Sequence, residues 1–337
     1  LELRCQNNVI SNLDVSQNTL LLRLYCFNNS LTSLDVSLNT QLEYLFCEHN
    51  QLASLDVINN TSLLDLRIQH NNISTLDVSQ NTLLQALYCY NNSLSILDVS
   101  LNTQLESLIC YSNQITTLDV SNNISLLDLW CGQNTISTLD VSQNTLLRSL
   151  RCNDNFLTVI DVSSNTQLED LFCNNNQLTA IDVSNNTSLL KLRIQYNNIS
   201  TLDVSQNTLL LRLYCYDNSL TSLDVSLNTQ LEYLLCNDNQ LIFLDIKNGY
   251  NSFMTGFVAN SNPNLFCINV DDSTYSSNNW LNIDPQSYFS ESCIINQNSS
   301  SSISIDSLAI NDIDCYGELG EILLYIDNDT NATNCNS

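Results

Sequence analysis

Aspartate is the most regularly spaced of the residues that could carry chemistry. A Leu-Asp or Ile-Asp pair recurs every 21 residues from Asp14 to Asp245, giving twelve carboxylates. If successive copies stack at the spacing of β-strands, about 4.8 Å, the carboxylates form a file that could hold calcium. The alternative is that each carboxylate accepts hydrogen bonds within its own turn, because Val-Ser-x-Asn-Thr follows most copies. Both interpretations stay open, and no other cofactor is expected.

Cysteine falls into two groups, of which the larger follows the same period. Ile68 and Ile194 replace cysteine in two copies, which indicates an apolar, inward position where a free thiol acts as a small hydrophobe. Side chains stacked about 4.8 Å apart exceed the roughly 3.8 Å Cβ separation that a disulfide prefers, so we expect reduced thiols. The periodic cysteines are Cys5, Cys26, Cys47, Cys89, Cys110, Cys131, Cys152, Cys173, Cys215 and Cys236.

The four cysteines outside the period are free to form disulfides. They are Cys267, Cys293, Cys315 and Cys335, and a bridge between Cys267 and Cys293 is the first one we expect. Bridges in this part of the chain would agree with an oxidising, extracellular setting.

Two histidines, His49 and His70, are one period apart and should lie side by side, as a two-ligand metal site would need. Only Glu48 is near as a further donor, so we favour coincidence over metal binding. No serine, cysteine or carboxylate constellation accompanies them, and the sequence therefore predicts no enzymatic activity.

Aromatic residues and arginines occupy one position of the period, directly before the periodic cysteine. Such enrichment on an exposed strand face is typical of recognition surfaces, and rings can also stack on sugars. The alternative is simple β-propensity, with rings that pair across neighbouring strands. Including two tyrosines just after the cysteine, the candidate ligand-binding residues are Tyr25, Phe46, Arg67, Tyr88, Tyr90, Tyr111, Trp130, Arg151, Phe172, Arg193 and Tyr214.

The element that must position these residues is a 21-residue unit, LxxLxCxxNxLxxLDVSxNTx, seen from Leu42 to Thr61 with Ile58 in place of the serine. Its fourth position is leucine in all twelve copies and its eleventh is always Leu or Ile, which predicts a stacked core. This pattern resembles the leucine-rich-repeat family of bacterial cell-surface and secreted proteins. The resemblance implies a horseshoe solenoid with a parallel β-sheet on its concave face and extended segments with short turns on its convex face.

Asparagine fills the ninth position of every copy, from Asn8 to Asn239, and resembles the asparagine ladder of that family. The amide can donate to and accept from the turn backbone of adjacent coils. The second half of the unit is too short for a regular α-helix, so tight or 3₁₀ turns should fill it. With so few glycines, we expect asparagine to take the left-handed turn positions.

Three segments follow from the pattern: a solenoid of twelve repeats at 1–249, a β-rich C-terminal capping module at 250–293, and at 294–337 a linker and the start of an immunoglobulin-like module. Leu1 lies inside a repeat, so we expect a cap or further repeats before it. The stretch from Ile313 to Asp327 resembles such a module. The apolar residues expected to cover the last coil are Leu265, Phe266, Ile268, Val270, Trp280, Leu281 and Ile283.

Net charge narrows the classes of partner. Nine basic against 35 acidic residues give a formal charge of −26, which opposes binding to nucleic acid, and no run of 18 apolar residues would insert into a membrane. The sequence thus predicts a non-catalytic binding module of a secreted, adhesin-like bacterial surface protein with a protein or polysaccharide ligand. The alternative is an acidic spacer rod of a larger surface protein, with calcium as the ion it could bind.

Overall fold

The computed structural model describes residues 1–293, and the segment 294–337, with Cys315, Cys335 and the expected immunoglobulin-like start, lies outside the described residues. Each repeat contributes one three-residue strand that begins two residues after the first leucine of the unit. These strands are β1 (Glu2–Arg4), β2 (Arg23–Tyr25), β3 (Tyr44–Phe46), β4 (Asp65–Arg67), β5 (Ala86–Tyr88), β6 (Ser107–Ile109), β7 (Asp128–Trp130), β8 (Ser149–Arg151), β9 (Asp170–Phe172), β10 (Lys191–Arg193), β11 (Arg212–Tyr214) and β13 (Tyr233–Leu235).

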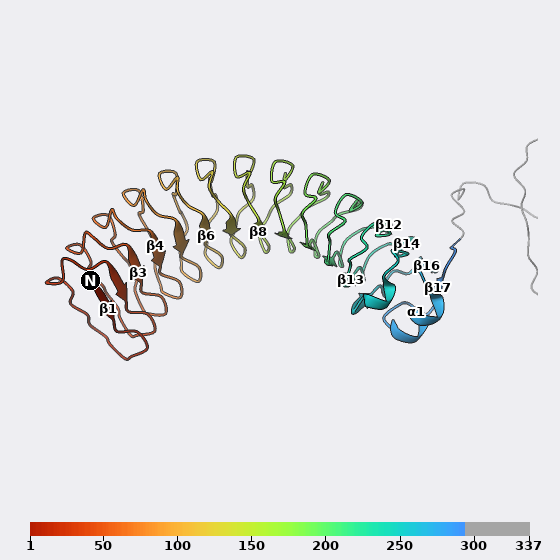
Figure 1. The fold of residues 1–337 in the computed structure, drawn as a ribbon, viewed down its shortest axis with the longest axis horizontal. Helices are drawn as coiled ribbons and strands as arrows, with labels where there is room; N and C mark the ends of the chain where they lie inside the picture. The colour runs from red at the N-terminus through yellow and green to blue at the C-terminus, as the bar shows by residue number, and fades with distance from the viewer. Residues whose placement is uncertain (294–337) are drawn as a thin grey trace, which may run out of the picture. The chain divides into compact units, whose positions relative to one another are not determined.

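The twelve strands stack as a parallel sheet in which every residue pairs with its counterpart 21 positions later, as Leu45 pairs with Leu66. Figure 1 shows the coils following one another, with the strands along one side of the solenoid. The in-register stacking and the solenoid fold predicted from the repeat are confirmed.

The core is a continuous stack of aliphatic side chains and thiols. Leu45, Leu52 and Val57 of the third coil are fully buried, and the same positions are buried in its neighbours. A single coil buries too few such side chains, each contributing about 1.5–3 kcal/mol, to offset the ordering of its backbone. Stability therefore comes from each coil packing on the next one.

The return half of each coil is extended and is closed by tight turns, as expected, since no helix occurs in it between Leu1 and Gly249. The left-handed residue of each coil is at the eighth position of the unit, directly before the ladder asparagine. Asparagine was expected there but fills only four of the twelve coils. The left-handed residues are Asn7, Asn28, His49, His70, Asn91, Ser112, Gln133, Asp154, Asn175, Tyr196, Asp217 and Asp238.

A second, four-stranded parallel sheet forms on the return side at the C-terminal end of the solenoid. Its strands are β12 (Ser222–Asp224), β14 (Phe243–Asp245), β16 (Cys267–Asn269) and β17 (Tyr288–Ser290). The capping segment also holds the 3₁₀ helix η1 (Asn251–Phe253), the strand β15 (Gly256–Val258) and the helix α1 (Ser273–Asn279). The sequence predicted strands in the cap but not the helix α1. Asp272 caps this helix by accepting a hydrogen bond from the Tyr275 amide at 2.8 Å.

The first sheet continues into the capping segment, because β15 adds to β13 as a thirteenth parallel strand. In this coil Phe257 takes the leucine position and Ala259 the cysteine position. Asn262 repeats the ladder contacts, donating to the carbonyls of Cys236 and Ala259 at 3.1 and 2.9 Å. A Cβ on Gly256 would come within 2.4 Å of the Tyr233 ring, so only glycine lets β15 approach. The periodicity is stretched by two residues here, which hid this coil from the sequence pattern.

The cap closes the core with an aromatic cluster in which Phe257 lies 4.6 Å from Trp280 and 6.1 Å from Phe289. Two of the apolar residues expected to cover the last coil, Phe266 and Leu281, are exposed instead. Side chains alternate along an extended segment, and these two lie on its outer side. The expected disulfide between Cys267 and Cys293 is present. No helix within residues 1–293 is long and apolar enough to cross a membrane.

Candidate binding surface

The outer side of the thirteen-stranded sheet, here called the sheet face, carries the candidate ligand-binding residues in consecutive coils. Nine of them lie at the last position of a strand, where inward leucine and cysteine flank the outward residue, whereas Tyr90 and Tyr111 lie two residues beyond β5 and β6. All of the candidates lie on this face, but they are half-buried where the sequence predicted exposure, and Phe172 is only 9% exposed. The cause is lateral packing, since counterparts one coil away cover both flanks of each side chain.

Arginines and aromatic rings alternate along the sheet face. The Arg67 guanidinium lies over Phe46 at 4.3 Å and over Tyr88 at 4.7 Å. Tyr25 meets Phe46 edge-on at 5.0 Å, which completes a first stack in β2–β5. Ile109, buried in β6, interrupts the sequence of contacts.

A second stack spans β7 to β11. The Arg151 guanidinium lies 3.8 Å from the Trp130 ring centre and 4.7 Å from that of Phe172. The Arg193 guanidinium lies 4.5 Å from Phe172 and 4.9 Å from Tyr214. Such contacts contribute about 0.5–1 kcal/mol each and hold the guanidinium groups in fixed positions.

The two stacks differ in how their arginines are neutralised. Arg67 donates to both oxygens of Asp65, with Nη2 to Oδ2 at 2.9 Å. Arg151 reaches Asp170 only at 3.5 Å, and Lys191 lies closer to that carboxylate, at 3.1 Å. Arg193 has no carboxylate within 4.0 Å and its side chain makes no hydrogen bond inside residues 1–293. The second stack therefore carries unneutralised positive charge in a strongly acidic protein.

The tyrosines predicted just after the periodic cysteine also meet. Tyr90 and Tyr111 stack with their ring centres 4.4 Å apart. Partial burial, and then the neighbouring Tyr90, raise the pKa of Tyr111 to about 12, so the Tyr111 phenol is a neutral donor at ordinary pH.

A hollow of about 310 Å³ opens on the sheet face between Tyr111 and Arg193, with Trp130 and Arg151 on its wall. It exists because Gly132 stands where other coils carry a longer side chain. A Cβ on Gly132 would lie 2.8 Å from the Asn153 side-chain oxygen and 2.9 Å from its carbonyl. Sequence reasoning missed this hollow, although Gly132 is the first glycine of the sequence and the next is Gly249, at the end of the repeats.

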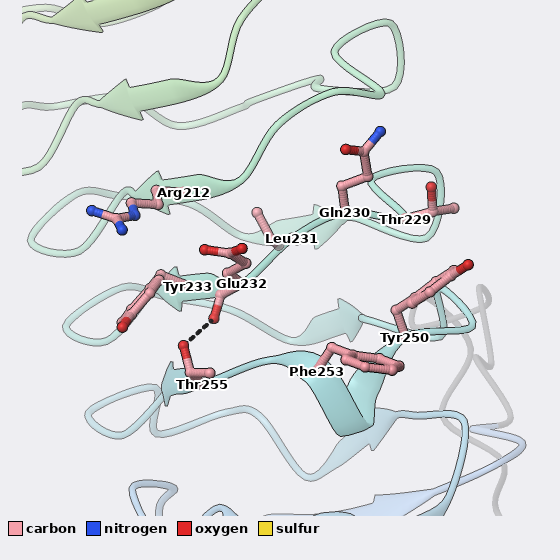
Figure 2. Close-up of a pocket in the computed structure, with 9 residues that line it drawn as sticks. All are labelled: Arg212, Thr229, Gln230, Leu231, Glu232, Tyr233, Tyr250, Phe253 and Thr255. Atoms are coloured by element: carbon pink, nitrogen blue, oxygen red, sulfur yellow. Dashed lines mark hydrogen bonds between the residues drawn. The ribbon is translucent and has the colours of Figure 1, made fainter.

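A second hollow of about 600 Å³ lies where the last repeat meets the cap. Figure 2 shows Arg212, Glu232 and Tyr233 on one side and the exposed rings of Tyr250 and Phe253 on the other. The latter rings come from η1, the insertion that interrupts the period. None of these residues was a sequence candidate, because the pattern ends here.

His49 and His70 lie side by side as predicted, with rings stacked at 4.1 Å and 14°. Burial and the neighbouring His49 lower the pKa of His70, which favours the neutral form of the His70 ring. Among residues 1–293 no group of three or more histidine, cysteine, aspartate or glutamate side chains is close enough to hold a metal ion. Stacked faces, with no third donor beside them, fit packing better than coordination.

The aspartate file makes the local hydrogen bonds of the alternative interpretation. In Asp119 the Oδ1 atom accepts from the Ser121 amide at 2.9 Å, and eleven further repeats have the same contact two residues on. These hydrogen bonds lower the pKa of Asp119 and Asp140. The carboxylates are exposed, and calcium binding along the file stays a prediction.

Two asparagine ladders hold the coils together, of which the sequence reading assigned one. In the predicted ladder, Asn50 accepts from the Leu31 amide and donates to the carbonyls of Cys26 and Cys47. The other ladder, here the turn asparagines, lies fully or almost fully buried and donates to two carbonyls of the preceding coil. Its buried members are Asn39, Asn60, Asn81, Asn102, Asn123, Asn144, Asn165, Asn186, Asn207 and Asn228. The signal for this ladder in the sequence was the asparagine that precedes Thr or Ile near the end of every repeat but the last.

The thiols form the expected ladder: nine of the ten periodic cysteines are buried, Cys5 is half-buried, and all ten are free. Burial raises the pKa of Cys89 and of Cys152 to about 12, so neither forms a reactive thiolate at neutral pH.

Comparison with solved structures finds the same architecture. The functional domain of InlJ from Listeria monocytogenes, described as including a cysteine ladder, is 35% identical with a TM-score of 0.70, over 80% of this chain and 67% of that one. An internalin, inlF, from Listeria monocytogenes is 24% identical with a TM-score of 0.64, over 73% and 76%. The protein LIC12759 of Leptospira interrogans is 19% identical with a TM-score of 0.58, over 82% and 85%. No protein-family model matches the sequence, and no curated protein matches it.

Proposed function

Because this chain belongs to the leucine-rich-repeat family, we propose that it is a non-catalytic binding module that holds a protein ligand along its sheet face. The observation that carries the proposal is the pair of aromatic–arginine stacks in β2–β5 and β7–β11, which no core-packing need explains. Half-buried aromatic residues and arginine with fixed geometry are the side chains that contribute most to protein interfaces.

A protein ligand fits the ring geometry better than a polysaccharide. Sugars stack on free aromatic faces, whereas guanidinium groups already cover the ring faces of Phe46 and Phe172. Polar edges and guanidinium donors remain for hydrogen bonds to a peptide. The disulfide between Cys267 and Cys293 supports a secreted or cell-surface location for this module.

The test is selection of a displayed random peptide library on the full chain and on a variant with Tyr88→Ser, Trp130→Ser and Arg151→Ser. The wild-type chain should enrich a family of related peptides, and the variant should lose at least tenfold in affinity for them. A matched control, Ile96→Ser with Phe156→Ser and Val159→Ser, removes exposed apolar area away from the sheet face and should bind as the wild type does.

Equal binding by the sheet-face variant would overturn the proposal. So would a chain that enriches no peptide but retains oligosaccharides on a glycan array, since the ligand class would then be wrong. Circular dichroism melting of all three proteins checks that a loss of binding is not a loss of fold.

A further inference from the structure

At the hollow beside Gly132 the sheet face opens next to an arginine, Arg193, that has no carboxylate within 4.0 Å among residues 1–293. The first stack has no equivalent, because Arg67 is held by Asp65 and no glycine interrupts that part of the face. The second stack places Arg151 and Arg193 on the hollow's wall, beside Trp130.

Cations accumulate on the strands that border this hollow. Lys191 pairs with Arg212 across β10 and β11, and Arg193 lies on the same strand as Lys191. The half-buried carboxylate nearest to them, that of Asp170, is shared between Lys191 and Arg151. Asp128 lies close enough to Arg151 to interact with it electrostatically, whereas Arg193 has no carboxylate within 4.0 Å among residues 1–293.

The arginine nitrogens are positioned but unsatisfied. The Nε atoms of Arg151 and Arg193 are covered by neighbouring side chains and out of a ligand's reach, so a ligand would meet the terminal Nη donors. The side chain of Arg193 is partly exposed, and its Nη atoms make no hydrogen bond within residues 1–293. A guanidinium group has five donors in a planar fork that matches a carboxylate, and its stacking between rings removes most of the ordering cost of binding. An oxyanion is the ligand group that would satisfy them.

Resting on the proposed function, we propose that this hollow takes the carboxylate of a single aspartate or glutamate side chain of the ligand, bound by Arg193 with Arg151 beside it. A highly sulfated polysaccharide would meet the same arginines, but its charge density is repelled by the acidic surroundings. A single carboxylate flanked by neutral residues is not repelled to that extent, because it carries only one charge. The volume of about 310 Å³ suits one or two side chains rather than an extended polymer.

The experiment titrates the full chain with two acetylated, amidated heptapeptides of sequence Gly-Ser-Tyr-X-Tyr-Ser-Gly, where X is Glu or Gln. Trp130 fluorescence is the readout, because it lines the hollow whereas the other tryptophan of the chain, Trp280, is buried in the cap. We expect the Glu peptide to bind at least tenfold more tightly at low salt. Arg193→Gln should reduce that ratio to about twofold or less, and the matched control Arg67→Gln should leave it unchanged.

Each outcome bears on the carboxylate site alone or on the whole face. Equal binding of both peptides by the wild type, with loss on Tyr111→Ser, overturns the carboxylate site but leaves sheet-face recognition intact. If Arg67→Gln reduces the ratio as much as Arg193→Gln does, the preference for Glu comes from general electrostatic attraction. That result also overturns the carboxylate site. Displacement of the Glu peptide by a sulfated heparin tetrasaccharide at equal concentration would assign the hollow to sulfate instead. Absence of any peptide binding at millimolar concentration also refutes the site, whereas the library selection decides the proposed function separately.

Discussion

At the scale of single residues, the turn asparagines link each coil to the one before it. Asn144 is fully buried and donates to the carbonyls of Val120 and Asn123, both at 2.9 Å. Each of these carbonyls also accepts a backbone amide, from Asn123 and Leu126 respectively. The side-chain amide is thus the second partner of each carbonyl and ties one coil to the next.

Asn144→Ala should lower the free energy of unfolding by about 1–2 kcal/mol, because two buried carbonyls lose a partner while keeping another. Urea denaturation followed by circular dichroism measures it. The neighbouring exposed residue gives the control, as Gln143→Ala should change stability by less than about 0.5 kcal/mol. Equal losses in the two variants would contradict the assigned role.

Gly132→Ala tests whether the glycine is there to let two coils approach. The new methyl group would lie 2.9 Å from the Asn153 carbonyl oxygen, which a backbone shift must relieve. Such overpacking costs about 1–3 kcal/mol. Thermal melting should show the loss, and a stability equal to that of the wild type would mean that the coils have room to spare.

At the scale of the element, the strand with its following turn is the unit that sets chemical reactivity. The cysteine that directly follows a strand faces the core, and the in-register spacing of the coils separates the cysteines from one another. The thiols of Cys131 and Cys173 have pKa values raised well above the ordinary range, chiefly by burial.

Buried thiols in this ladder should resist alkylation. Native protein treated with iodoacetamide at pH 8 should carry label on Cys5 before any cysteine from Cys26 to Cys236, because only Cys5 is partly accessible. Mass spectrometry of tryptic peptides locates the label, so the cysteines beyond residue 293 do not confuse the result. After unfolding in guanidinium chloride all ten should react. Early labelling of Cys131 in the native protein would show that the central coils open.

At the scale of the whole molecule, repulsion among the acidic groups and the local hydrogen bonds to them have opposite effects on how stability depends on pH. Hydrogen bonds donated by their own turns lower the pKa of Asp98 and of Asp161 in the file. Burial instead raises the pKa of Glu48 and of Asp128, which therefore favour folding more once protonated. Repulsion among the carboxylates also weakens as the pH falls towards the pI of about 4.1.

The protein should therefore be most stable at mildly acidic pH, and its stability should decrease below about pH 4. A carboxyl whose pKa is lower in the folded state stabilises fully above its unfolded value of about 3.9 and loses that contribution as the pH drops through the folded value. The melting temperature measured from pH 8 to pH 2 should rise slightly towards pH 5 and then decline. A melting temperature that keeps rising to pH 3 would show that repulsion outweighs the turn hydrogen bonds.

The sequence by itself determined the coil, its register and the inward positions, because a strict 21-residue period leaves one way to stack and each copy repeats the same burial. It also indicated the thiol ladder, the ninth-position asparagines and the bridge between Cys267 and Cys293. Only the tertiary structure decided which stripe residues are covered, which arginine lacks a carboxylate, and that a thirteenth coil follows residue 249. These depend on the size and conformation of neighbours one coil away, as at Gly132, where a missing side chain in one coil shapes the surface of several.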